Sequence, residues 1–253
     1  MIETDEGGNY ITFSSMGLSS SGKLYLEDQP MASCDGLVGA GTTCYRAKLP
    51  GSIRWDFVLK FKWRWARDRP ESELLKLAKE NCTWGAVSFD YYQEVESTAN
   101  LRRGLRWGTH KRFVRMHSCE GHVETKELRQ EVACTANELS ECTEETNNFF
   151  QNRILACIVT SPIGRPVHTF GSVLELLQVF RDAIKCHRSL FCDAKILHQD
   201  VSVGNIVIFL DGQDKGEPKG ILIDFDSATK FTEGSGTDTG IIGTRPFMAI
   251  GHS

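Results

Sequence analysis

The sequence predicts an α+β fold made of two lobes, and three observations support this prediction. Strand patterns lie between residues 37 and 62, with apolar alternation at 57–62, and a continuous apolar run at 154–160 indicates a buried strand. Apolar residues recur at helical spacing over 173–187. Two short apolar strands between 206 and 224 are separated by a polar, glycine-containing loop, which is typical of a hairpin. The turn at 161–166 would then separate a β-rich N-terminal lobe from a helix-containing C-terminal lobe.

The composition indicates a globular protein and argues against a nucleic-acid-binding or membrane-spanning one. The 253 residues suffice for one large domain or two small lobes. A net charge of −4 argues against a nucleic-acid partner, since a phosphate backbone favours a basic surface. No apolar run approaches the ~20 residues that a membrane helix needs. The nine cysteines include no C-x-x-C pair, so we expect reduced thiols and an intracellular location, cytoplasmic or nuclear.

Three segments are expected along the chain. Residues 1–35 form an N-terminal extension, with little regular structure up to about Pro30, because glycine, serine and acidic residues are mixed there. Residues 36–160 form the β-rich lobe, with a polar insertion at about 98–148. Residues 161–253 form the second lobe. The insertion holds three neighbouring side chains of metal-binding type but no obvious fourth, so a zinc site is not predicted: His117, Cys119 and His122.

The strand at 57–62 follows a glycine turn that contains Gly39 and Gly41. Strand alternation places Val58 and Lys60 on one face and the intervening apolar residues on the other. A lysine beside a small apolar residue, across from a glycine turn, can hold phosphates while its neighbour packs on a base. The alternative is an ordinary solvated strand lysine.

A helix is expected to begin after Pro70, because proline suits the first helical turn and acidic residues follow it. Glu71 flanks the apolar stripe of this helix and could reach Lys60. Glu73 is the alternative partner, and both residues could simply be first-turn acids that interact with the helix dipole.

The helix at 173–187 has a capping box, formed by Ser172 and Glu175. Its helically spaced apolar residues are predicted to belong to the core: Val173, Leu177, Phe180 and Ile184. The buried strand at 154–160 precedes it.

The most informative segment is His198-x-Asp200-x-x-x-x-Asn205, which is followed nineteen residues later by Asp224 at a strand end. A base, an amide oxygen and a second carboxylate are the groups that phosphoryl transfer requires. One orients the attacking hydroxyl, and two oxygen ligands hold magnesium on a nucleotide. The expected hairpin carries Asn205 at one end and Asp224 at the other, so both can converge on one ion.

With these motifs, and with Gly243-Thr244 leading into Phe247-Met248-Ala249-Ile250, the chain resembles the fungal-type protein kinase family, a divergent branch of the eukaryotic protein kinases. The resemblance runs from about Gly36 to Ile250. It implies a two-lobed protein-kinase-like fold whose helical C-terminal lobe is incomplete, because further helices would follow Ser253. Part of the apolar face of the 173–187 helix should then stay open, and the 253-residue chain should be marginally stable.

The resemblance also implies a role for each motif residue, with ATP and Mg²⁺ as cofactors and an unidentified protein as substrate. The implied catalytic residues are Asp200, Lys60 and Asn205. The implied nucleotide-binding residues are Gly39, Gly41, Val58, Lys60, Glu71, Val159 and Ser161. The implied metal ligands are Asn205 and Asp224, and Thr244 would lie near Asp200.

Five positions depart from the usual kinase pattern. Cys44 stands in place of a third glycine, Ser202 in place of a lysine, Asp226 in place of the glycine after Asp-Phe, and Gly251 in place of a glutamate. Gln199 replaces the arginine that pairs with a phosphorylated activation loop, so activation by loop phosphorylation is not expected.

The favoured function is ATP-dependent phosphorylation of a protein serine or threonine. Two alternatives stay open. Small-molecule phosphotransferases have a similar H-x-D-x-x-x-x-N element, and a truncated pseudokinase would bind nucleotide without catalysis.

Overall fold

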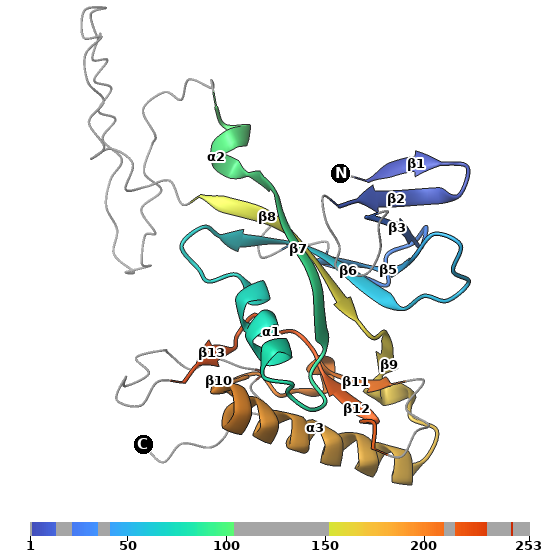
Figure 1. Cartoon of the computed structure of the whole chain (residues 1–253), viewed down its shortest axis with the longest axis vertical. Coiled ribbons are helices and arrows are strands. Elements are labelled where there is room, and N and C mark those ends of the chain that lie inside the picture. The colour runs from blue at the N-terminus through green and yellow to red at the C-terminus, as the bar shows by residue number, and fades with distance from the viewer. Residues whose placement is uncertain are drawn as a thin grey trace, which may run out of the picture.

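The computed structural model describes residues 2–13, 22–34, 41–103, 152–209, 216–231 and 244. These residues form an α+β structure in which a large antiparallel sheet lies over a smaller part that contains the long helix (Figure 1). The two-lobed α+β prediction is therefore confirmed.

The large sheet has eight strands among the described residues, all paired antiparallel. In spatial order seven of them are β1 (Glu3–Asp5), β2 (Gly8–Thr12), β3 (Lys23–Leu26), β5 (Thr43–Lys48), β6 (Phe57–Trp65), β8 (Arg153–Ser161) and β7 (Ser88–Ser97). The eighth, β4 (Ala32–Ser33), pairs with β5. The expected strands at 57–62 and 154–160 are thus present and longer than predicted.

The expectation of little regular structure before Pro30 is wrong, because β1, β2 and β3 lie in that segment and extend the sheet. Ile11, Leu24 and Leu26 are buried in the same cluster as Leu59. Only a few apolar residues alternate in each of these short strands, and the glycine and serine residues between them obscured the pattern.

The alternation predicted for β6 is confirmed. Phe57 and Leu59 are buried in the cluster on one face of the sheet. Val58 and Lys60 lie on the opposite face and line a cavity. Their backbones pair with Thr160 and Ile158 of β8.

Two helices accompany the large sheet. Helix α1 (Glu71–Glu80) begins directly after Pro70, as predicted, and buries Leu74, Leu75 and Ala78. Short helix α2 (Thr98–Leu101) begins at Ser97, whose hydroxyl accepts the backbone N–H of Asn100. Most of the insertion expected at 98–148, including the three metal-type side chains at 117, 119 and 122, lies outside the described residues.

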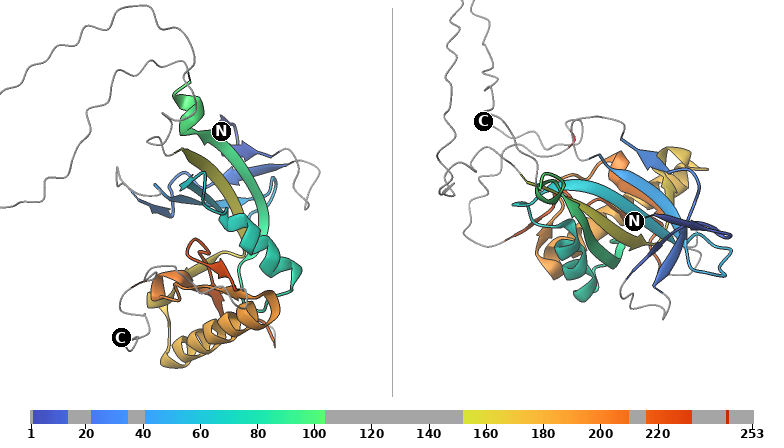
Figure 2. Two further views of the ribbon diagram at one scale, coloured as in Figure 1. Left: turned by 90° about the vertical axis from the view of Figure 1, so that its left-hand side faces the viewer. Right: turned by 90° about the horizontal axis from the view of Figure 1, so that it is seen from above.

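The smaller part consists of short strands packed on α3 (Val173–Ala194) (Figures 1 and 2). Its strands are β9 (Gly164–Pro166), β10 (Ile196–Leu197), β11 (Ile206–Phe209), β12 (Gly220–Leu222) and β13 (Thr229–Lys230), and its 3₁₀ helices are Val167–Thr169 and Val203–Asn205. β12, β11 and β9 form one antiparallel sheet, and β10 pairs with β13. The hairpin predicted between 206 and 224 is therefore confirmed.

Helix α3 confirms the predicted cap and corrects the predicted core face. The Ser172 hydroxyl accepts the backbone N–H of Glu175 at 3.1 Å. The helix buries Val179, Asp182, Ala183, Cys186, Leu190 and Ala194. Of the four residues predicted as core, Val173, Leu177 and Ile184 are 59–69% exposed and Phe180 is only partly buried. The buried residues follow a second helical stripe that includes small side chains and a carboxylate, so apolarity alone identified the wrong face.

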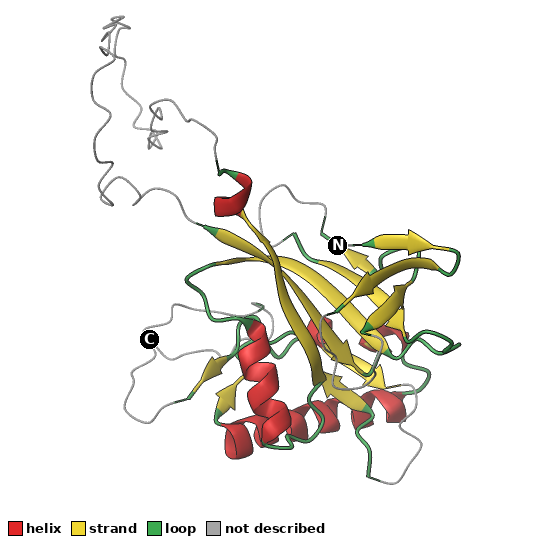
Figure 3. Cartoon of the chain, turned by 45° about the horizontal axis from the view of Figure 1, so that its top comes forward, coloured by secondary structure: helices red, strands yellow, loops and turns green. Residues whose placement is uncertain are grey.

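The expectation of open apolar surface on this helix is confirmed by the same exposures. Figure 3 shows α1 and α3 lying on one side of the large sheet. Both helices contribute buried residues to the core that they share with β11 and β12. No helix in the described part of the chain is long and apolar enough to cross a membrane.

Candidate active site

A cavity of about 280 Å³ brings together the site residues that the sequence placed far apart. Lys60 comes from β6, Glu71 from the start of α1, Asn205 from the end of a 3₁₀ helix, and Asp224 from the residues after β12. The remaining lining residues are Met31, Ala32, Thr42, Cys44, Val58, Val87, Ile158, Thr160, Pro162, Gly164, Gly204, Val207 and Ile223.

The Lys60 amine lies at the centre of three carboxylates. Its Nζ is 3.1 Å from Glu71 Oε2, 2.8 Å from Asp224 Oδ1 and 3.3 Å from Asp226 Oδ2. Glu73, the alternative partner, lies beside Arg69 instead. Burial disfavours the charged amine, but the negative charges of Glu71 and Asp224 outweigh it and raise the pKa of Lys60. Lys60 therefore stays protonated at neutral pH.

Glu71 joins α1 to the segment that follows β12. Its carboxylate is 4% exposed, and Oε1 accepts the backbone N–H of Phe225 at 2.9 Å. Its other oxygen, Oε2, accepts a hydrogen bond from the Lys60 amine. Because a buried carboxylate needs hydrogen-bond donors, these two contacts stabilise it and fix the start of α1 over the cavity.

Asp224 is held in an unusual backbone conformation, with φ at +64°. Such a value is uncommon for residues other than glycine, although aspartate adopts it more readily than most. Burial would raise the pKa of Asp224, but Lys60 overcomes this effect and lowers it below its ordinary value. Asp224 is therefore ionised at neutral pH.

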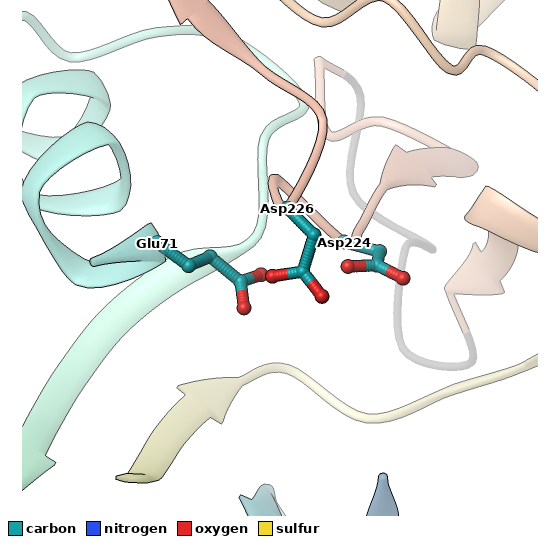
Figure 4. A group of neighbouring side chains, drawn as sticks. All are labelled: Glu71, Asp224 and Asp226. Carbon is teal, nitrogen blue, oxygen red and sulfur yellow. The ribbon is translucent and has the colours of Figure 1, made fainter. Parts of the chain in front are cut away.

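Three carboxylates, those of Glu71, Asp224 and Asp226, present oxygen atoms within 4.8 Å of one another (Figure 4). Lys60 contacts all three, and Lys62 contacts Glu71 and Asp226. Because the lysines already balance much of the negative charge, we interpret this trio as an ion-pair network.

Asn205 and Asp224 fit the oxygen-rich ligand set that Mg²⁺ prefers. The Asn205 Nδ2 group donates to the backbone oxygen of Asp200 at 2.9 Å and to its Oδ2 at 2.8 Å. The amide oxygen is thus the atom of Asn205 that can ligate a cation. The backbone N–H of Ile223, next to Asp224, donates to the Asn205 carbonyl at 3.0 Å, which ties the two candidate ligands together.

Asp200 is oriented from both sides. Its Oδ2 receives Asn205, and its Oδ1 receives the backbone N–H of Thr244 at 2.9 Å and the Thr244 hydroxyl at 2.7 Å. The structure thus places Thr244 beside Asp200, where the resemblance expected it. A carboxylate with fixed orientation next to a candidate metal site is suited to position a hydroxyl group.

His198 supports the same loop from inside. Its ring is fully buried, and Nε2 donates to the carbonyl of Ile223 at 3.1 Å. Burial lowers the pKa of His198, so the imidazole is neutral. The ring also packs edge-on against Phe225, with centroids 5.1 Å apart. We therefore interpret His198 as a structural residue that connects the Asp200 loop to the Asp224 segment.

The apolar wall of the cavity differs from the predicted one at two positions of β8, Val159 and Ser161. Ile158 and Thr160 line the cavity, whereas Val159 is fully buried with Leu59 on the opposite face of the sheet. Side chains alternate along a strand, so Val159 cannot share the face of its neighbours. Ser161, also predicted, is half-buried outside this lining.

The glycine turn is described only in part. Gly39 lies outside the described residues, and Gly41 has φ at +54°, a value that favours glycine. Cys44 lines the cavity near Lys60, and burial raises the pKa of its thiol. The thiol is thus largely protonated at neutral pH.

Sequence reasoning missed Lys62 as a site residue and noted Asp226 only as a departure from the usual pattern. Lys62 is 7% exposed and its amine binds the Asp226 carboxylate. Alternation along β6 was the available signal, because residues 58, 60 and 62 share one face.

Comparison with known families gives one match. The family model described as fungal protein kinase matches residues 1–252. A search of curated proteins found no match.

Proposed function

The chain belongs to the fungal protein kinase family, and from this premise we propose that it transfers the γ-phosphate of ATP to a serine or threonine hydroxyl of a protein. One observation carries the proposal. One cavity is lined by four residues that come from distant parts of the sequence: Lys60, Glu71, Asn205 and Asp224. Asp200 lies next to it, hydrogen-bonded to Asn205.

The nucleotide would be held by both faces of this cavity. Lys60, kept protonated by Glu71 and Asp224, supplies a positive charge for the phosphates. Val58 and Ile158 supply apolar surface for the base. Magnesium, bound through Asn205 and Asp224, would neutralise charge on the phosphates.

Asp200 would position the acceptor. Its carboxylate orients the hydroxyl, whose oxygen attacks the γ-phosphorus while the bond to the β,γ-bridging oxygen breaks and ADP leaves. The hydroxyl proton passes to Asp200. The two hydrogen bonds from Thr244 to Asp200 support a protein acceptor, because they bring Thr244 next to the proposed base.

The direct test is phosphate transfer from radiolabelled Mg·ATP to a panel of protein and peptide acceptors, followed by identification of the labelled amino acid. We expect label on serine or threonine, and its loss in Lys60→Met and Asp200→Asn. Lys76→Met, an exposed lysine of α1 paired with Glu80, is the matched control. Transfer to a small hydroxyl compound instead of protein would identify a small-molecule phosphotransferase. Nucleotide binding without any transfer would identify a pseudokinase.

The six described cysteines are free thiols. They are consistent with a reducing compartment, and the cytoplasmic or nuclear location stays a prediction.

A further inference from the structure

Lys62 is a buried lysine that the proposed reaction does not use directly. It lies two residues after Lys60 on the same face of β6, and its side chain is 9% exposed. Lysine is rarely this buried unless carboxylates compensate its charge. Lys62 has two such partners, since its amine binds Asp226 Oδ1 and lies 3.6 Å from Glu71 Oε2.

Asp226 connects Lys62 to the phosphate-binding position. One of its oxygens receives Lys62, and the other lies 3.3 Å from Lys60 Nζ. The Asp226 carboxylate therefore bridges the two lysines. Figure 4 shows how it extends toward the carboxylates of Glu71 and Asp224.

This bridge creates a competition. Phosphates and the Asp226 carboxylate are both negatively charged, so both would be attracted to the Lys60 amine and compete for it. With Lys62 present, the Asp226 carboxylate forms an ion pair with a second cation besides Lys60. With Lys62 removed, Lys60 would be the cation left in contact with Asp226 in this network of described residues. Lys60 would then be drawn away from the phosphates.

Charge balance leads to the same conclusion. The network contains three carboxylates, of Glu71, Asp224 and Asp226, and two amines, of Lys60 and Lys62. Loss of one amine doubles the excess negative charge, from one to two, at the place where an anionic nucleotide would bind.

We propose that Lys62 is a positioning residue that holds Asp226 so that Lys60 is available to the phosphates of the nucleotide. This inference rests on the proposed function, because it assumes that Lys60 binds phosphate. In this role Lys62 acts indirectly, through Asp226, and does not contact the nucleotide itself.

The test is a double-mutant cycle on the affinity for Mg·ATP, measured by titration calorimetry with the whole chain. The four proteins are wild type, Lys62→Met, Asp226→Asn and the double variant. Lys62→Met should weaken binding on the order of tenfold, because it leaves Asp226 with Lys60. Asp226→Asn should tighten binding by at most about fivefold, since the carboxylate is 31% exposed and its pull on Lys60 is partly screened.

Rescue is the decisive readout. The double variant should bind Mg·ATP close to the wild-type affinity, because both members of the pair are then neutral. A purely structural lysine would not be rescued in this way. Equal affinities of wild type and Lys62→Met, or a double variant as weak as Lys62→Met, would overturn the inference.

Lys60→Met and urea unfolding of each variant complete the design. If wild type binds Mg·ATP and only Lys60→Met abolishes binding, the nucleotide site of the proposed function stands and the inference about Lys62 fails. If wild type does not bind Mg·ATP, the proposed function fails and the inference fails with it. If Lys62→Met does not fold, the folded double variant decides the question. Near-normal affinity supports the inference, and weak binding overturns it.

Discussion

The Lys60 amine lies 2.8 Å from the Asp224 carboxylate, although 164 residues separate them in the chain. This ion pair joins the large sheet to the segment that follows β12, across the cavity that Glu71 and Asn205 also line. Since Lys60 is 14% and Asp224 39% exposed, water screens the pair only in part. The contact fixes the position of the large sheet relative to the segment after β12, and both contribute residues to the proposed nucleotide site.

Asp224→Ala should remove the metal-dependent part of ATP binding. The substitution deletes one of the two oxygen ligands proposed for magnesium, and the rate of transfer should fall on the order of a hundredfold, as when one electrostatic contact is removed from a transition state. ATP affinity measured with and without magnesium checks this. An affinity that still depends on magnesium as in wild type would show that the metal assignment is wrong.

Glu71 and Glu73 provide a matched pair on one helix. Glu71 is buried against Lys60 and Phe225, whereas Glu73 is 61% exposed beside Arg69. Glu71→Gln should lower the free energy of unfolding by roughly 1–3 kcal/mol, since the charge that compensates Lys60 is lost. Glu73→Gln should change it by less than about 0.5 kcal/mol. Urea unfolding measures both, and equal effects would contradict the assignment of Glu71.

The comparison of these two acids shows what the sequence could predict. Spacing placed both near Lys60, but only packing of α1 decides which one faces the cavity. Motif residues such as Asn205 and Asp224 were predictable, because a hairpin brings its own ends together. From the sequence, the exposed stripe of α3 was assigned to the core. This helix has more than one apolar stripe, and tertiary contacts decide which stripe is buried.

Weak local signals account for the other differences. The strands β1, β2 and β3 were missed because each contributes few buried residues. The position of the Val159 side chain away from the cavity was not predictable, because the side-chain register along β8 becomes visible only from its pairing with β6. Lys62 was overlooked because an alternating lysine usually indicates a solvated strand face.

The pH dependence of stability should reveal Asp224. Burial alone would raise its pKa, but Lys60 lowers it below the ordinary value, so the folded state binds this proton less readily than the unfolded chain. The stabilising contribution is therefore present above the unfolded pKa of about 3.9 and is lost as the pH falls through the lower folded value. The difference in urea midpoint between wild type and Asp224→Asn should thus shrink below about pH 4. A constant difference through this range would contradict the pKa direction.

Phosphorylation of the segment between residues 232 and 244 should not be the main activity switch. Gln199 is neutral and cannot form the charge-assisted pair that an arginine forms with phosphate. Its Oε1 is buried without a hydrogen-bond partner. Phosphatase treatment should therefore leave transfer activity largely unchanged. A large loss of activity that is restored when this segment is rephosphorylated would refute the prediction.

The open face of α3 should govern self-association of the chain more than its folding. Leu177 and Ile184 are 59% and 69% exposed, whereas Leu190 on the opposite stripe is fully buried. Exposed apolar patches favour association, so Ile184→Lys should reduce concentration-dependent light scattering. The free energy of unfolding of this variant should differ from that of wild type by less than about 0.5 kcal/mol, because the exposed Ile184 side chain makes few contacts in the folded state.

Leu190→Ala is the matched control on the same helix. It removes a core side chain and should lower the free energy of unfolding by roughly 2–5 kcal/mol, a large share of the ~5–15 kcal/mol that stabilises a typical domain. Urea unfolding at low protein concentration separates the two effects. If Ile184→Lys destabilises the fold as much as Leu190→Ala does, the exposed stripe is part of the core after all. If scattering is unchanged while stability is preserved, association of the chain involves another surface.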